Sequence, residues 1–233
     1  MSSWHGYQTL LGFWQSAWPD TDPKKQQKFN LLMAAYDNGR HYHTTEHLLE
    51  CFSAWEEVSH HPKIAGKVDE RAVVLSVFYH DCLYNIRAID NEAKSVDAWS
   101  EDAKGVFDRE LVAKVGRAIL ATGQLLGYQA YADAPIEALL LCDLDLSFFA
   151  RATTERIVAY EHQIWLEYRD AEARSDHSQL EPGYYYQRIR VIKRILQQQP
   201  LFHLISEWEQ AAHISLAYLL GRVEERATRS LGI

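Results

Sequence analysis

An imidazole and a carboxylate stand side by side at the end of a strongly apolar run, Val77-Phe78-Tyr79-His80-Asp81. The residues before them, from Ala72 onward, are nearly all apolar, which predicts a buried helix. Burying two ionisable neighbours costs several kcal/mol unless each finds a partner. A divalent metal ion would satisfy both at once, so we expect the chain to fold around this pair.

Two further groups of metal-binding residue types flank the pair. His43 and His47 lie upstream at i, i+4 spacing, and Asp143 and Asp145 lie downstream in another apolar run. His47 precedes His80 by 33 residues, and Asp145 follows the pair by 64, so the three groups belong to different helices. Facing helices are where helical bundles build metal sites. The spacing therefore predicts a site assembled from three helices.

Apolar residues recur at helical spacing along nearly the whole chain, and no alternating strand pattern interrupts them. The pattern predicts an all-α fold, a helical bundle forming a single domain over residues 1–233. An aromatic N-terminal helix (3–18) and C-terminal helices (153–226) are expected to pack on a metal-binding core (28–150). After the N-terminal helix we expect helices over 23–36, 45–58, 69–81, 108–122 and 136–149, and another that begins at 91. The C-terminal helices are expected over 153–173, 184–198 and 206–226, with a loop at 175–183.

The N-terminal helix carries Trp4, Tyr7, Leu10, Trp14 and Trp18 on one face. Such a stripe is typical of packing rather than of a ligand groove. The sequence leaves open whether it packs on the chain's own core or on a second copy of the chain in a homodimer.

Composition excludes several classes of function. The formal net charge of −8 argues against binding of a nucleic acid polymer, which requires a basic surface, but is compatible with a small phosphorylated ligand. No run of about 18 apolar residues is present to span a membrane, and no signal peptide is evident. Three cysteines, each in an apolar stretch, are expected to be reduced core thiols, which favours a cytoplasmic protein.

Four residues form the candidate ligand set: His47, His80, Asp81 and Asp145. Two imidazoles and two carboxylates suit one divalent transition metal ion, Mn²⁺, Fe²⁺, Co²⁺, Ni²⁺ or Zn²⁺, and suit Mg²⁺ less well. A metal with six positions would keep two for water and substrate, as catalysis requires. Spacing alone leaves open an ion-free scaffold in which His80 and Asp81 pair with each other or with an arginine.

These motifs together resemble the HD superfamily of metal-dependent phosphohydrolases. More narrowly, the chain is similar to a group of bacterial proteins described as predicted metal-dependent HD phosphohydrolases. The resemblance covers about residues 4 to 220, and the matching stretches are Arg40 to His47, Tyr79 to Tyr84, Asn91 to Ser95, Cys142 to Ser147, Glu167-Tyr168 and Glu209 to Ala212.

The resemblance implies that the metal ligands are His47, His80, Asp81 and Asp145. Asp143 is the alternative to Asp145. We favour Asp145 because Asp145-Leu146-Ser147 is similar to the ligand-bearing Asp-Leu-Ser of cyclic-nucleotide phosphodiesterases, distant relatives in the superfamily. No histidine lies between the pair and Asp145, as superfamily members with two metals would have, so a single metal is expected.

Catalytic roles follow from the same resemblance. Tyr42-His43-x-x-x-His47 is similar to the phosphodiesterase arrangement in which the first His acts on the leaving group, which makes His43 a candidate general acid. A helix N-terminal His bonded to backbone is the other interpretation. Asp81 would orient the attacking water. Tyr84 stands where nucleotidases of the superfamily carry a Glu, so Glu92 is the candidate base, with helix capping as its alternative.

The expected reaction is hydrolysis of a small phosphoester, a nucleotide or a phosphomonoester. Arg40, Arg87 and Lys94 flank the motifs and are candidates for binding the phosphate, although charged groups at helix ends are usually just solvated. One departure counts against activity: the narrower group has a His shortly after the position of Thr122, and this chain has Gln124 and Leu125 there. The alternative function is a non-catalytic metal- or nucleotide-binding helical module that acts through protein partners.

Overall fold

The apolar run lies in the buried helix that its pattern predicts, Glu70–Tyr79, and several of the other helices pack against it. The computed structural model describes residues 4–123, 134–171 and 180–230, which contain ten α-helices and no strand. The all-α prediction is confirmed. The helices are α1 (Trp4–Ala17), α2 (Lys25–Tyr36), α3 (Thr45–Val58), α4 (Glu70–Tyr79), α5 (Asn91–Ala103), α6 (Arg109–Gly123), α7 (Ile136–Arg151), α8 (Thr154–Asp170), α9 (Leu180–Leu196) and α10 (Glu209–Ser230), preceded by a short 3₁₀ turn, η3 (Ser206–Trp208).

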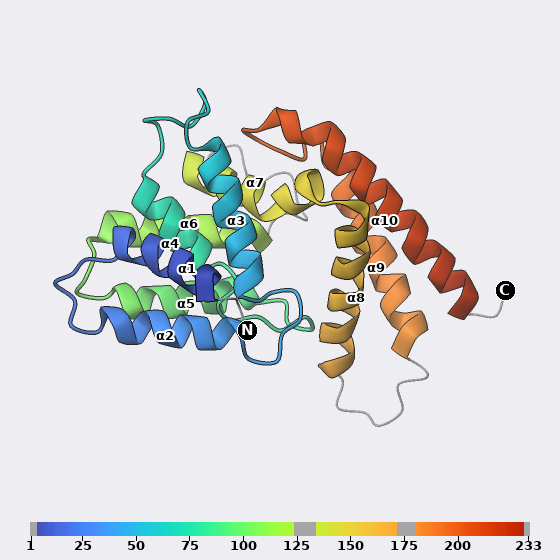
Figure 1. Ribbon diagram of the computed structural model, residues 1–233, viewed down its shortest axis with the longest axis horizontal. Coiled ribbons are helices and arrows are strands. Elements are labelled where there is room, and N and C mark those ends of the chain that lie inside the picture. Colours follow the sequence, from blue (N-terminus) through green and yellow to red (C-terminus); the bar gives the residue numbers. More distant parts are fainter. Residues whose placement is uncertain (1–3, 124–133, 172–179, 231–233) are drawn as a thin grey trace.

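Two groups of helices are joined by α7. Figure 1 shows α1 to α6 gathered on one side and α8 to α10 on the other, with α7 running between them. The helix α7 packs against α3, α4 and α6 on one side and against α10 on the other. The candidate ligand Asp145 therefore lies on the element that both groups share.

The central helix α4 places the His-Asp pair. Asp69 caps its N-terminus by accepting the N–H of Ala72 at 3.2 Å, and every residue from Ala72 to Tyr79 is buried. The helix ends at Tyr79, slightly earlier than expected, and His80 is its C-cap. Because His80 and Asp81 follow the last helical residue, the chain can turn both side chains toward the neighbouring helices.

The aromatic N-terminal helix packs on the chain's own core. Trp14 and Trp18 are fully buried and stack on each other with ring centroids 4.5 Å apart. Trp14 also meets Phe78 of α4 edge to face at 5.4 Å. Trp4, at the start of the helix, is 78% exposed and lies outside this core. The aromatic stripe thus belongs to internal packing.

The starts of α2 and α9 both differ from the sequence expectation. The second helix begins at Lys25 rather than at Pro23, because the Asp22 carboxylate accepts bonds from the Lys24 N–H and the Trp18 indole and holds a turn there. The helix α9 begins at Leu180, so the expected loop is wrong over 180–183. A proline is tolerated in a first helical turn, where its missing N–H has no partner to lose. Residues 175–179, Gln124 and Leu125 lie outside the described residues.

Asp143 fastens the C-terminal part of the chain to α7. The side chain is fully buried, and its carboxylate accepts the backbone N–H groups of His203, Leu204 and Ile205 at 2.7, 2.7 and 3.0 Å. Residues two apart on a helix point about 200° apart, so Asp145 faces the opposite side of α7. Asp143 is therefore occupied in holding the segment that leads into α10.

We predict that Asp143→Ala lowers the free energy of unfolding by about 3 kcal/mol, because three buried N–H groups lose a charged acceptor. Urea unfolding in the presence of a chelator measures it. Asp145→Ala is the matched control and is expected to have a clearly smaller effect. Equal losses for the two variants would contradict this assignment.

Candidate metal centre

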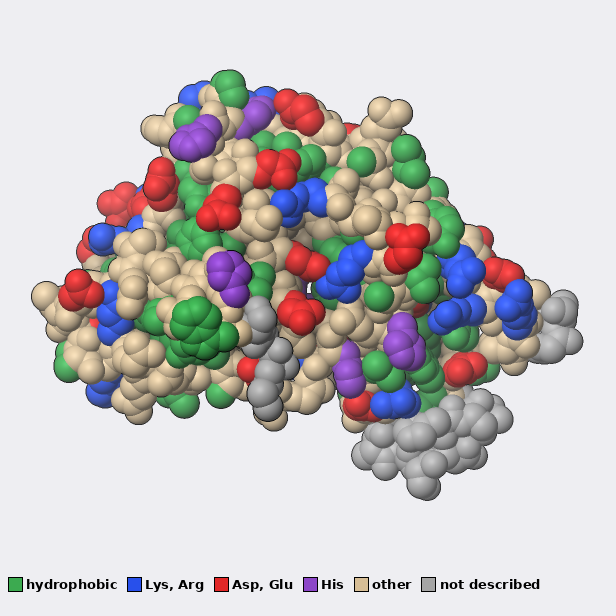
Figure 2. Space-filling model, in the orientation of Figure 1, with side chains coloured by type: hydrophobic (Ala, Val, Ile, Leu, Met, Phe, Trp, Pro, Cys, Tyr) green, Lys and Arg blue, Asp and Glu red, His purple; other side chains and the backbone are tan. Residues whose placement is uncertain are grey.

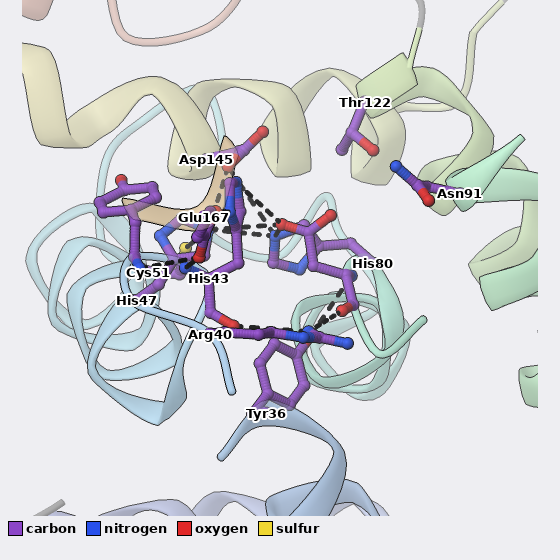
Figure 3. A network of polar contacts seen from close by, with 12 residues as sticks. Tyr36, Arg40, His43, His47, Cys51, His80, Asn91, Thr122, Asp145 and Glu167 are labelled. Atoms are coloured by element: carbon purple, nitrogen blue, oxygen red, sulfur yellow. Dashed lines mark hydrogen bonds and ion pairs between the residues drawn. The ribbon is translucent and has the colours of Figure 1, made fainter. Parts of the chain in front are cut away.

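Three of the four candidate ligands converge between α3, the end of α4, and α7. One ligand atom from each of His47, His80 and Asp145 lies within 4.8 Å of the others. The two Nε2 atoms are 3.2 Å apart, and Asp145 Oδ1 lies 3.2 Å from His47 Nε2 and 3.8 Å from His80 Nε2. Figure 3 shows these side chains pointing toward a common point. The geometry brings together the three segments that the spacing assigned to different helices.

Asp81 borders the same point. Its Oδ2 lies 3.2 Å from His80 Nε2 and 4.0 Å from His47 Nε2. Burial alone would raise the pKa of the Asp81 carboxyl, but the neighbouring His80 holds it well below its usual range. All four candidate ligands therefore lie together, and Asp143, whose carboxylate faces residues 203–205, does not join them.

The tautomer of His80 leaves its ligand atom available. The Val77 carbonyl can only accept, so His80 Nδ1, at 2.9 Å from that oxygen, carries a proton and donates it. A histidine that binds a metal commonly donates its second ring N–H in this way, which orients the ring. Nε2 then points at the two carboxylates.

The donor set fits a divalent cation, and a proton is the competing occupant. Burial disfavours the charged form of His80, but the Asp81 and Asp145 carboxylates outweigh it and raise the pKa of His80 to about 9. Two facing Nε2 atoms can share only one proton, whereas one divalent metal can accept a lone pair from each. Among the residues that the structure describes, the buried His47 Nδ1 has no hydrogen-bond partner. Two imidazoles and two carboxylates are a mixed nitrogen and oxygen set that first-row transition metals accept.

His43 stands beside the cluster and is held by Glu167 of α8. His43 Nδ1 lies 2.8 Å from Glu167 Oε2, and its Nε2 lies 4.0 Å from Asp81 Oδ2. Its ring stacks on Tyr84 with centroids 3.8 Å apart. A carboxylate accepts, so Nδ1 carries a proton, and Nε2, which can carry a second one, faces the cluster. The ring is thus bonded to a side chain rather than to backbone.

Glu167 organises the whole loop that carries His43. Its Oε1 accepts the backbone N–H groups of His41, Tyr42 and His43 at 3.0, 2.8 and 3.0 Å. Burial alone would raise the pKa of this carboxyl, but these bonds and His43 lower it to about 2. Sequence reasoning assigned Glu167 no role. The available signal was its position in the buried stripe of Tyr160 and Ile164, where an acidic residue is unusual.

A cavity of about 370 Å³ opens beside the cluster. His43, Asp145 and Glu92 line it, together with a wall of aromatic residues: Tyr42, Tyr84, Phe149, Tyr160, Tyr168 and Tyr184. Glu92 lies against Gly123, where an added Cβ would come within 2.6 Å of the Glu92 carboxyl carbon, so the glycine leaves room for this side chain. The candidate acid, base and one candidate ligand therefore share one cavity.

The three residues expected to bind phosphate do not line this cavity. Arg40 donates from Nη1 to the Asp81 carbonyl at 2.6 Å and from Nη2 to the Cys82 carbonyl at 2.9 Å, capping the end of the segment that carries the ligands. Lys94 is exposed and pairs with Asp90 at 2.8 Å, and Arg87 lies over the ring of Tyr168 at 4.8 Å. The cation on the cavity wall is instead Arg188 of α9.

The surface carries both signs of charge. Figure 2 shows Lys and Arg side chains interspersed with Asp and Glu over the face drawn. None of the helices in the described part of the chain is long and apolar enough to cross a membrane. Comparison of the chain with protein-family models, with curated proteins and with solved structures found no match.

We predict that Glu167→Gln lowers the free energy of unfolding at pH 7 by about 2 to 3 kcal/mol, since the carboxyl pKa falls from 4.5 to about 2 on folding. A carboxyl whose pKa is lower in the folded state stabilises the fold at pH values above its unfolded-state pKa. This stabilisation is lost as the pH falls toward the folded-state pKa. The difference from wild type should therefore shrink below pH 4.5. Urea unfolding in chelator, from pH 7 down to the lowest pH at which both proteins fold, measures it. A difference that is constant with pH would refute the account.

Proposed function

We propose that this protein is a metal-dependent phosphohydrolase of the HD type that hydrolyses a small phosphoester, a nucleotide or a phosphomonoester. The observation that carries the proposal is the convergence of two imidazoles and two carboxylates beside an aromatic-walled cavity that His43 and Asp145 line. One divalent transition metal ion would be held by His47, His80, Asp81 and Asp145. When bound, it would polarise a phosphoryl oxygen and make a water molecule a stronger nucleophile.

His43 is the proposed general acid. Its Nε2 faces the cluster, at 4.0 Å from Asp81 Oδ2, where it can donate a proton to the oxygen that leaves as the ester bond breaks. Glu167 keeps the other proton on Nδ1 and holds the ring in this orientation. The bond to Glu167 therefore fixes the direction in which His43 donates its Nε2 proton.

Two carboxylates are the proposed acceptors for the attacking water. Asp81 stays ionised beside His80 and can accept a hydrogen bond from the water, which orients it toward phosphorus. Glu92 lines the same cavity and can take up a proton from it. The proposed acid, His43, thus lies in the loop before α3, and the proposed base, Glu92, lies on α5.

The alternative is a non-catalytic module that binds a metal or nucleotide and acts through partners. Tyr84, at the position where related nucleotidases carry a Glu, favours it. The cavity supports the enzyme, because a purely structural metal site is closed by protein ligands, whereas Asp145 here borders open space. We also infer a cytoplasmic location, since Cys51, Cys82 and Cys142 are all buried free thiols.

The test is hydrolysis of a panel of nucleotides and phosphomonoesters by protein loaded with Mn²⁺, Co²⁺, Ni²⁺, Zn²⁺ or Mg²⁺. We expect turnover by the wild type with a transition metal and none by the His80→Ala/Asp81→Ala variant, which should also lose about one metal ion per chain. His43→Gln should keep the metal and lower kcat roughly 100-fold or more.

His41→Gln is the matched control, because His41 lies two residues away and pairs with Asp170 at the surface. It should keep nearly full activity. Metal binding without turnover on any substrate would favour the non-catalytic module. No metal in the wild type, even after reconstitution, would remove the basis of both proposals.

A further inference from the structure

The cavity beside the candidate metal centre has one permanent cation among its described lining residues, the guanidinium of Arg188. Arg188 lies in α9, next to α8 (Figure 1), and only 9% of its surface is exposed. It occupies the buried stripe of α9 together with Tyr184, Ile192 and Ile195. A charged residue in such a stripe costs free energy unless it is paired. Any donor that the protein leaves without a partner is available to a ligand.

Two of the three guanidinium nitrogens are held by α8. Nε donates to Glu161 Oε2 at 2.9 Å, and Nη2 donates to the Tyr160 hydroxyl at 2.7 Å. Glu161 is itself held, because its Oε1 accepts from the Tyr184 hydroxyl at 2.6 Å. Nη1 makes no hydrogen bond within residues 4–123, 134–171 and 180–230. The planar group is therefore fixed in direction, with one nitrogen left to donate.

A buried ion pair of this kind is weak evidence of a stabilising role. Taking an Arg–Glu pair out of water costs free energy that its attraction often fails to recover, and apolar residues of similar volume frequently serve as well. The neighbouring positions of the same stripe, Ile192 and Ile195, are apolar. Burial disfavours the charged form of Arg188, but Tyr160 and Glu161 raise its pKa, so the cation persists. A role in binding explains why a charge is placed there.

Two tyrosine rings connect the guanidinium to the candidate metal centre. Tyr160, which accepts from Arg188, packs its ring 4.5 Å from Tyr42, and the Tyr42 ring lies 5.1 Å from that of His47. His43 and Asp145 line the same cavity as Arg188. A ligand in this cavity can therefore meet the cation and the candidate catalytic groups together.

We propose that Arg188 binds a phosphoryl oxygen of the substrate through Nη1 and so anchors a phosphate group beside the metal centre. This rests on the proposed function, which makes the substrate a phosphoester. A guanidinium held by two partners offers a directed, charged donor, the kind that recognises phosphate oxygens. Arg188 thereby takes the role that the sequence assigned to Arg40, Arg87 and Lys94.

The test is calorimetric titration of the protein with orthophosphate and with pyrophosphate, in chelator and again with Mn²⁺. Arg188→Lys keeps the charge that pairs with Glu161, but a lysine held there has no second nitrogen for the ligand. We expect binding to weaken about tenfold, the equivalent of one charged hydrogen bond. Arg156→Lys is the matched control, because Arg156 on α8 pairs with Glu50 at 2.7 Å and is not among the cavity's lining residues.

A loss confined to Arg188→Lys supports the proposal. Equal affinity of wild type and Arg188→Lys for both anions overturns it, and so does the absence of any phosphate binding by the wild type. If Mn²⁺ tightens orthophosphate binding, Arg188 and the metal bind the same phosphoryl group. If Mn²⁺ tightens only pyrophosphate binding, the metal binds one phosphoryl group and Arg188 binds the other. Binding is measured without turnover, so a lack of hydrolysis counts against the proposed function and not against this site.

A second measurement does not depend on the folding of a variant. Tungstate is a tetrahedral oxyanion like phosphate, and its heavy atom can be located by anomalous scattering in crystals of the wild-type protein. We expect tungstate oxygen within hydrogen-bond distance of Arg188 Nη1. Tungstate bound only at other places on the molecule would overturn the proposal.

Discussion

Two imidazole nitrogens held 3.2 Å apart inside a protein need a proton or a metal ion between them, because two facing lone pairs repel each other. His47 and His80 are in this position, and Asp81 and Asp145 add two carboxylates around the same point. The helices α3, α4 and α7 must each present the correct face for these groups to meet. The requirement that buried charges be balanced links the packing of the core to the chemistry of the site.

Backbone groups near the cluster are satisfied by charged side chains, which keeps the segments around it in place. Arg40 donates to the carbonyls of Asp81 and Cys82, and Glu167 accepts three N–H groups of the loop that carries His43. Figure 3 shows both side chains beside the candidate ligands. Charged hydrogen bonds of this kind are about twice as strong as neutral ones. The bonds of Arg40 and Glu167 therefore hold the loops on either side of the cluster in place.

Much of the fold could be predicted from the sequence, because helical periodicity and caps are local properties. Thr44 caps α3 and Asp69 caps α4, and both are residue types that favour helix N-caps. The grouping of His47, His80, Asp81 and Asp145 was also predictable, with the help of a family resemblance. Choosing between Asp143 and Asp145 from geometry required the structure, since the partners of Asp143 lie 60 to 62 residues away in sequence.

The charged residues around the site were harder to predict. Arg40 adjoins the motif and suggested phosphate binding, but its nitrogens are used by two carbonyls that only the folded chain brings near. Glu167 and Arg188 are far from the motif, and their roles follow from contacts between α8, α9 and the His43 loop. Their position in apolar stripes was a local sign that they are unusual, and Glu167 also lies in a stretch that matches the family.

The proposed function depends on a divalent metal ion that binds among these four side chains. Anomalous diffraction at the manganese absorption edge, from crystals soaked in Mn²⁺, would locate such an ion. We expect one strong peak within bonding distance of His47 Nε2, His80 Nε2 and Asp145. A fully soaked crystal with no peak at that point, or with manganese only at surface carboxylates, would contradict it.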